Sequence, residues 1–281
     1  MNSVSVKAHR RAAWPMPDKL DDWRSWQIAL ARYAFCSQFV SGKKVLDIAC
    51  GGGYGSYYLY DKGAQMVVGG DMWPEAVQYA TRCYGGENTH FLRLDACHLP
   101  FPNAYFDVVA SFETIRYMPD PAQFVVECLR VLKSGGLFIC STPNREATSN
   151  ESHTELVSWA GNEFNRVKFQ KLLDKYLIFV QVYDLNPIPS GNGKTGRLVS
   201  WGGKIVLSLG RIPGVIPLVN SVVGLFYPRY RLVCLEKVVD WDGMLDPTLK
   251  PYLLQDGARP GTCIVAVGRK PDSISQAKPV I

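Results

Sequence analysis

The chain has 281 residues, of which 47% are hydrophobic and 20% charged, a composition that excludes a disordered or fibrous protein. The basic start, residues 1–11, has no apolar core segment, and no run of about 18 apolar residues follows. We therefore expect a cytoplasmic protein without a secretory signal or a membrane-spanning helix. The net charge of +6 includes a late basic segment, residues 190–237, with seven Lys or Arg against the single acid Glu236.

From Lys44 to Thr142, short apolar runs alternate with helix-like segments. This alternation predicts a parallel sheet with right-handed crossovers. The expected strands are Val45–Ala49, Met66–Gly70, Thr89–Leu94, Phe106–Phe112 and Leu137–Ser141. The expected helices are Ser56–Lys62, Pro74–Tyr84 and Pro121–Leu132, the last two with proline in the first turn.

After Pro143 we expect a helix over Glu163–Tyr176, a strand over Leu177–Leu185 and a last strand over Thr262–Arg269. The fold class is therefore α/β, a Rossmann-like, mostly parallel seven-stranded sheet with helices on both faces and an insertion before the last strand. The expected domains are an N-terminal extension or lid (1–43), the core (44–185 and 262–270), an insertion that caps the acceptor site (186–261) and a disordered tail (271–281).

The eight cysteines are scattered, with no CxxC pair. A structural zinc site needs closely spaced paired ligands, and a disulfide framework suits a small secreted domain. We therefore expect free thiols and no metal site.

The strongest local signal is a strand that runs into a glycine-rich turn and a helix, Val45-Leu-Asp-Ile-Ala-Cys-Gly-Gly-Gly-Tyr-Gly55. Glycines permit positive φ and close approach of the backbone to a bound nucleotide. The next strand ends at Asp71, whose carboxylate can accept hydrogen bonds from two ribose hydroxyls. Nicotinamide-dependent oxidoreductases share this logic, so the turn alone does not separate the two classes.

Four segments in order, VLDIACGGGYGS, GGDMWPEAV, LRLDACHLPFPNAYFDVVASFETIRYMPDP and LRVLKSGGLFICSTPNR, resemble the class I S-adenosylmethionine-dependent methyltransferases of the type 11 group. The resemblance covers roughly residues 30–185 and returns at the last strand. It implies that S-adenosyl-L-methionine is the cofactor. An oxidoreductase is not expected to carry the third and fourth segments.

The resemblance also implies a role for each matching residue. The methionine end of the cofactor would lie at Asp47 and at the turn formed by Ala49, Gly51 and Gly53, where Ala49 replaces the usual first glycine. The ribose would bind Asp71, and the adenine would pack on Met72 and bind Asp95 and the backbone N–H of Ala96. Phe112 and Glu113 would line the side of the methyl donor, although Phe112 could equally be plain core.

Many relatives carry Glu-x-x-Glu-His at the end of the fourth strand, where this chain has Glu113-Thr-Ile-Arg116-Tyr117. Two metal ligands are thus missing, and we expect metal-independent chemistry. Tyr117 and His153 are the candidate bases, with simple packing and a solvated loop as the alternatives. Arg116 would pair either with an anionic acceptor or with Glu113.

The acceptor site is expected to include Trp26 and Tyr33, whose aromatic segment could equally be core. We expect O-methylation of a sugar, glycan precursor or secondary metabolite, with N- or C-methylation of a lipid-like or other natural product as the alternative. A membrane-surface or anionic-ligand binding module with a vestigial cofactor fold is the alternative from another class. Nucleic acid is not an expected partner. Residues 190–237 could contact a membrane or an anionic substrate, or form a homodimer contact.

Overall fold

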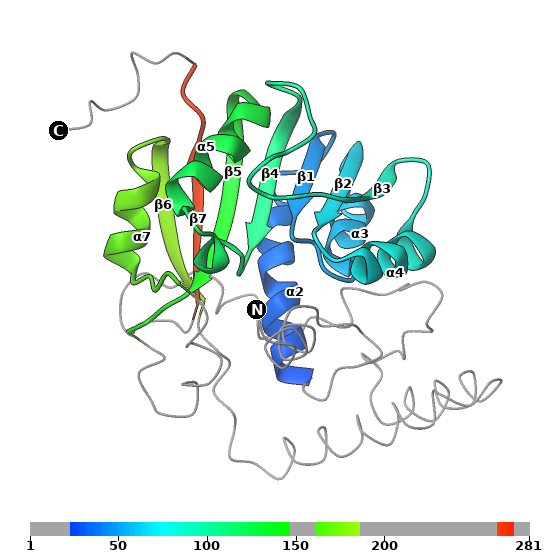
Figure 1. The fold of residues 1–281 in the computed structure, drawn as a ribbon, viewed down its shortest axis with the longest axis horizontal. Helices are drawn as coiled ribbons and strands as arrows, with labels where there is room; N and C mark the ends of the chain where they lie inside the picture. The colour runs from blue at the N-terminus through cyan, green and yellow to red at the C-terminus, as the bar shows by residue number, and fades with distance from the viewer. Residues whose placement is uncertain (1–22, 147–160, 186–262, 273–281) are drawn as a thin grey trace, which may run out of the picture. The chain divides into compact units, whose positions relative to one another are not determined.

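The computed structural model describes residues 23–146, 161–185 and 263–272 (Figure 1). The chain separates into two compact units, one of residues 32–187 and 251–281 and the other of residues 1–31 and 188–250. The first unit contains the whole sheet. It begins at Arg32 and so includes the end of a helix over Trp23–Ser37, which the sequence analysis did not predict within its N-terminal extension (1–43). The predicted cap (186–261), the basic segment (190–237), the tail from 273 on and His153 lie outside the described residues.

The sheet has seven strands in the order β3-β2-β1-β4-β5-β7-β6, which confirms the predicted fold class. β7 is antiparallel to β5 and β6, and all other neighbours are parallel. The strands are β1 (Lys44–Ile48), β2 (Met66–Asp71), β3 (Thr89–Arg93), β4 (Phe106–Phe112), β5 (Leu132–Pro143), β6 (Ile178–Leu185) and β7 (Cys263–Arg269).

The helices are α2 (Trp23–Ser37), α3 (Tyr54–Asp61), α4 (Pro74–Tyr84), α5 (Pro121–Val131) and α7 (Arg166–Leu173), with a 3₁₀ turn η1 at Ile115–Tyr117. Two of them begin at side-chain caps. Asp120 accepts hydrogen bonds from the backbone N–H groups of Ala122 and Gln123, and Asn165 accepts one from Lys168.

Two boundaries differ clearly from the sequence prediction. β5 begins at Leu132 rather than Leu137, because Phe106 of β4 already pairs with Leu132. The pairing register then shifts between Phe106 and Val108, because β5 has extra residues there. Gly135, with φ 69°, is one of these extra residues. α7 begins at Arg166 rather than Glu163, because Asn165 caps it. The first case depends on a partner far away in the sequence, whereas the Asn165 cap is a local signal that the sequence analysis missed.

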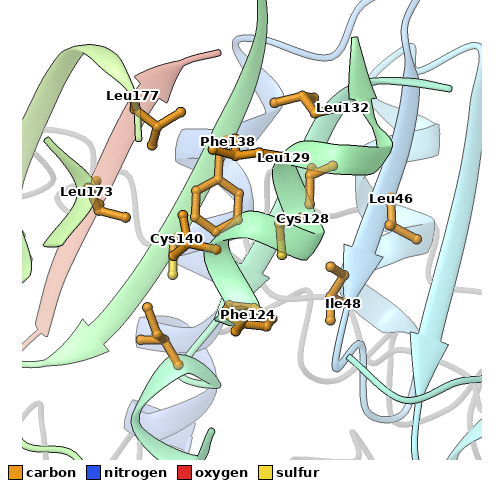
Figure 2. Close-up of a cluster of buried hydrophobic side chains, with 14 of the residues drawn as sticks. Leu46, Ile48, Phe124, Cys128, Leu129, Leu132, Phe138, Cys140, Leu173 and Leu177 are labelled. Atoms are coloured by element: carbon orange, nitrogen blue, oxygen red, sulfur yellow. The ribbon is translucent and has the colours of Figure 1, made fainter. Parts of the chain in front are cut away.

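Helices α5 and α7 cover one face of the sheet. Between them and the strands lies the main hydrophobic core, a cluster that includes Leu46 and Ile48 of β1, Phe124 and Cys128 of α5 and Leu173 of α7 (Figure 2). The intervening strand residues, among them Asp47, face the opposite side, where α3, α4 and the last turns of α2 pack. These two layers hold the strand ends in fixed positions.

Candidate functional site

The carboxyl ends of β1, β2 and β4 meet at one edge of the sheet (Figure 1). β1 lies between β2 and β4, so the chain leaves β1 toward one side and returns on the other side to form β4. In open α/β sheets such a switch in strand order leaves a crevice at the carboxyl ends, and ligands bind there. The predicted cofactor residues lie on the segments that follow these strands.

The turn after β1 is built from backbone angles that favour glycine. Gly51 has φ 56° and Gly53, the N-cap of α3, has φ 82°. Ala49 has φ 59°, a left-handed conformation that costs an L-residue about 1 kcal/mol. Its replacement of the usual glycine is therefore accommodated, with strain that the sequence alone did not indicate.

Asp71 connects the first two strand ends. Its Oδ2 accepts a hydrogen bond of 2.9 Å from the Gly51 N–H, and its Oδ1 accepts one of 3.0 Å from the Trp73 N–H. Burial raises the pKa of Asp71 above its ordinary value, and these backbone donors oppose that shift. Each carboxylate oxygen still has acceptor capacity for a ligand hydroxyl. The adjacent Met72 is 61% exposed.

Asp47 is fully buried. Its carboxylate accepts hydrogen bonds from Ser56 Oγ at 2.7 Å and from Tyr33 Oη at 3.2 Å. Burial raises its pKa to about 7, against the opposing effect of these two hydroxyls and with a smaller contribution from Asp71. Asp47 therefore supports the turn from beneath, and its predicted contact with the methionine end stays a prediction.

Tyr33 and Phe112 form an aromatic contact beside the turn. Their ring centroids are 4.9 Å apart in an edge-to-face arrangement, and both side chains are buried. A Cβ added at Gly55 would come within 1.9 Å of the Tyr33 ring, so glycine is required there. Gly55 of the motif is therefore explained by its packing against Tyr33 and needs no ligand as a reason.

Asp95 follows β3 and is the most open of the predicted acids. It accepts hydrogen bonds from the Cys97 N–H at 2.8 Å and from His98 Nδ1 at 3.0 Å, and its side chain is 63% exposed. The bond to His98 lowers the pKa of Asp95 below its ordinary value. Ala96 packs against the hydrophobic core.

Glu113 ends β4 in a left-handed conformation, φ 60°. Three donors converge on its Oε1: Ser141 Oγ at 2.8 Å, Cys263 Sγ at 3.1 Å and Arg32 Nη2 at 3.3 Å. The predicted alternative in which Glu113 pairs with Arg116 is therefore wrong, because Arg32 supplies the positive charge. Sequence reasoning missed all three donors, and no local pattern marks them, since they come from α2, β5 and β7.

Arg116 and Tyr117 lie in η1, just beyond Glu113. The Arg116 guanidinium is 5.4 Å from the centre of the Tyr117 ring. Burial raises the pKa of Tyr117, with Arg116 lowering it and Glu113 raising it. The phenolate is thus scarce at neutral pH, which favours a hydrogen-bonding role for Tyr117 over that of a base. Trp26 lies in α2.

The seven cysteines among the described residues are free thiols, as predicted. Within residues 23–146, 161–185 and 263–272, no three His, Cys, Asp or Glu side chains are grouped as a metal site would need. In the same ranges, no helix has the length and apolar character to cross a bilayer.

Comparison with known proteins identifies the domain. Residues 46–140 match a family model described as a methyltransferase domain. A probable S-adenosylmethionine-dependent methyltransferase of Mycolicibacterium smegmatis is 37% identical over 139 residues, 48% of this chain and 51% of that protein. A ubiquinone biosynthesis O-methyltransferase of Pseudomonas fluorescens is 38% identical over 110 residues, 38% of this chain and 47% of that protein.

The fold matches that of Haemonchus contortus phosphoethanolamine N-methyltransferase 2, solved in complex with S-adenosyl-L-methionine. The TM-score is 0.57 at 20% identity, over 85% of this chain and 52% of the other. This likeness concerns the fold alone. The chain spans about half the length of the curated relatives it matches.

Proposed function

We propose that this chain carries a class I S-adenosylmethionine-dependent methyltransferase domain and transfers the methyl group of that cofactor to an oxygen atom of a small-molecule acceptor. The observation that carries the proposal is the position of Asp71. This buried acid joins the glycine turn to the end of β2 and lies beside an exposed Met72.

The residues at the edge of the sheet fit the cofactor. Asp71 keeps acceptor capacity for the two ribose hydroxyls, and Met72 offers an apolar surface for the adenine ring. Asp95 is exposed and, with its lowered pKa, ionised at neutral pH, so that it can accept from the adenine amino group. The turn at Ala49–Gly53 would lie along the methionine end.

The cofactor supplies a sulfonium methyl group that is already a good electrophile. The protein then has to hold the acceptor in line with that methyl group and keep water out. Phe112 and Tyr33 provide a buried aromatic wall beside the turn, and Tyr117 supplies a phenol that can donate a hydrogen bond to the acceptor. A base is needed only if the acceptor must lose its proton early. Tyr117 and His153 remain the candidates for that role.

We assign oxygen as the acceptor atom of a sugar, glycan precursor or secondary metabolite. The similarity to an O-methyltransferase of ubiquinone biosynthesis supports an oxygen acceptor. Nitrogen or carbon acceptors, including lipid-like ones, are the alternatives that the assay below separates.

The test has two stages. Calorimetry should first detect binding of S-adenosylhomocysteine with a dissociation constant in the low micromolar range or tighter, about −8 kcal/mol. The protein is then incubated with methyl-labelled cofactor and a fractionated metabolite extract, and the labelled products are treated with mild base and analysed by mass spectrometry. The atom that carries the transferred methyl group is assigned from the ¹³C chemical shift of that group after transfer from ¹³C-methyl cofactor, since mild base releases the label only from methyl esters. Label attached to oxygen supports the proposal. Label on nitrogen or carbon overturns the assignment to oxygen, and absence of cofactor binding overturns the whole proposal.

A further inference from the structure

Arg116 has a positive charge that nothing in the described part of the chain neutralises. Its side chain makes no hydrogen bond or ion pair there, and its contact is the ring of Tyr117, 5.4 Å away. The Nε atom is buried and has no hydrogen-bond partner, as is also true of Arg32 Nε; the difference is that the Arg32 guanidinium pairs with Glu113 through Nη2, whereas Arg116 has no ion pair among the described residues. Buried polar atoms of this kind are rare in proteins, because an unmet donor costs free energy, and each one needs an explanation.

The nearest acid in sequence has another partner. Glu113 directs Oε1 to Arg32, Ser141 and Cys263, and Arg32 already supplies one positive charge. Arg32 therefore forms an ion pair with a protein carboxylate, whereas Arg116 forms none among the described residues and can pair with an anion from outside the protein.

The backbone that carries Arg116 is held in place. Ile115 is fully buried in the core. The Asn162 N–H donates to the carbonyl of Arg116 at 3.2 Å, and Asn162 Nδ2 donates to the carbonyl of Met118 at 2.7 Å. The guanidinium thus extends from a fixed point at the carboxyl edge of the sheet, and a ligand would not have to order the backbone first.

We propose that Arg116 binds an oxyanion group, a carboxylate or a phosphate, on the methyl acceptor. Guanidinium presents paired N–H donors that match the two oxygens of such a group, and the half-buried Tyr117 ring beside it can contact an apolar part of the same molecule. This inference rests on the proposed function and narrows the substrate class to acidic acceptors.

The test uses sodium benzoate, inorganic phosphate and neutral benzamide, each titrated by calorimetry into protein saturated with S-adenosylhomocysteine. Saturation keeps the probes out of the cofactor site. At least one anion should saturate its binding site at a concentration below about 10 mM. Benzamide should bind at least about tenfold more weakly than benzoate. Preference for benzoate identifies a carboxylate acceptor, and preference for phosphate a phosphorylated one.

Arg116→Gln should weaken anion binding by about tenfold or more, whereas Arg116→Lys, which keeps the charge but not the paired donors, should lose less. The matched control is Arg82→Gln, since Arg82 is exposed on α4 and contacts a tyrosine ring in the same way, 5.7 Å from Tyr79. This variant should bind the anions like the wild type.

Unchanged affinity in Arg116→Gln, or no anion binding to wild-type protein that binds S-adenosylhomocysteine, overturns the inference. Failure of the wild type to bind S-adenosylhomocysteine is a different result and overturns the proposed function instead. If Arg116→Gln itself loses S-adenosylhomocysteine binding, Arg116→Lys is compared with the wild type in its place, and equal anion affinity then overturns the inference.

Discussion

The carboxyl edge of the sheet has two halves, the ends of β1 and β2 and the end of β4, and different kinds of hydrogen bond hold each half together. At the ends of β1 and β2, the Asp71 carboxylate accepts from backbone N–H groups of residues close to the same two strands. At the end of β4, Glu113 accepts from the side chains of Arg32, Ser141 and Cys263, which belong to three separate elements.

This difference bears on how each half can change. Backbone donors are present whatever the side chain, so the bonds of Asp71 depend on the residues that permit the turn. Asp47 beneath it, however, needs the hydroxyls of Ser56 and Tyr33. The β4 half depends on the chemical identity of several side chains, and one replacement there alters its charge. The part at β1 and β2 therefore depends mainly on backbone conformation, and the part at β4 on side-chain chemistry.

The largest expected effect is on the pH dependence of stability and arises at Asp47, beneath the turn that follows β1. A pKa of about 7 in the folded protein, against 3.8 for the free side chain, means that the folded state keeps a proton that the unfolded state has lost. Stability should therefore fall as the pH rises from about 4 to about 7 and then level off, by roughly 4 kcal/mol at most. Urea unfolding of the wild type and of Asp47→Asn across this range measures the effect, since the variant should lack this slope.

The matched control for Asp47 is Asp95→Asn. Its bond to His98 lowers the pKa of Asp95, so its contribution to stability has the opposite sign and is lost as the pH falls. A stability curve of Asp47→Asn parallel to that of the wild type between pH 4 and 7 would show that Asp47 is ionised in the folded state.

The next largest effect concerns the affinity for the cofactor. Asp71→Ala removes the predicted charge-assisted bonds to two ribose hydroxyls and should weaken S-adenosylhomocysteine binding by about 2–3 kcal/mol, roughly a hundredfold. Calorimetry measures the dissociation constant of S-adenosylhomocysteine, with Asp61→Ala on the last turn of α3 as the control. Equal affinity of Asp71→Ala and the wild type would remove Asp71 from the cofactor site.

In the β4 half, a double-mutant cycle with Arg32→Met and Glu113→Gln should give a coupling energy of about 1–2 kcal/mol. The value lies below that of a fully buried pair, because the side chains are 13% and 27% exposed and water screens them. Urea unfolding of the four proteins gives the coupling. Additive effects, within about 0.3 kcal/mol, would mean that the contact is not an energetically coupled pair.

The contrast between the halves also explains what the sequence could predict. The order of the strands and helices from β1 on follows from local patterns, whereas α2 was missed. The glycine turn and Asp71 also follow from local patterns, and the structure places them at one edge of the sheet. The resemblance to a family supplied the roles of Met72 and Asp95. For Glu113, which directly follows β4, only the position after the strand end could be predicted.

The missed residues share one property. Arg32, Ser141 and Cys263 act through contacts that exist only once the sheet has formed, and Cys263 lies 150 positions from its partner Glu113. Hydrophobic periodicity carries no information about such pairs. The same limit applies to β5, whose true start depends on pairing with β4.

A smaller effect should arise at Ala49, where φ is 59°. Ala49→Gly should raise the free energy of unfolding by about 0.5–1 kcal/mol, because glycine adopts the left-handed region without a steric penalty. Ala76→Gly within α4 is the control, and it should lower stability because glycine is unfavourable inside a helix. Loss of stability in Ala49→Gly would mean that chain entropy outweighs strain at this turn.

Removal of divalent metal should have the smallest effect, with turnover unchanged. The family resemblance implies an acid and an imidazole where this chain has Arg116 and Tyr117, so that a cation and a phenol with a raised pKa stand in place of two candidate ligands. The remaining acid, Glu113, already has the Arg32 guanidinium 3.3 Å from Oε1, and that charge would repel a second cation at the same oxygen. Methyl transfer is therefore compared before and after dialysis against a chelator, with and without added Mg²⁺. Loss of turnover that Mg²⁺ restores would mean that residues beyond the end of β4 bind a metal despite these charges.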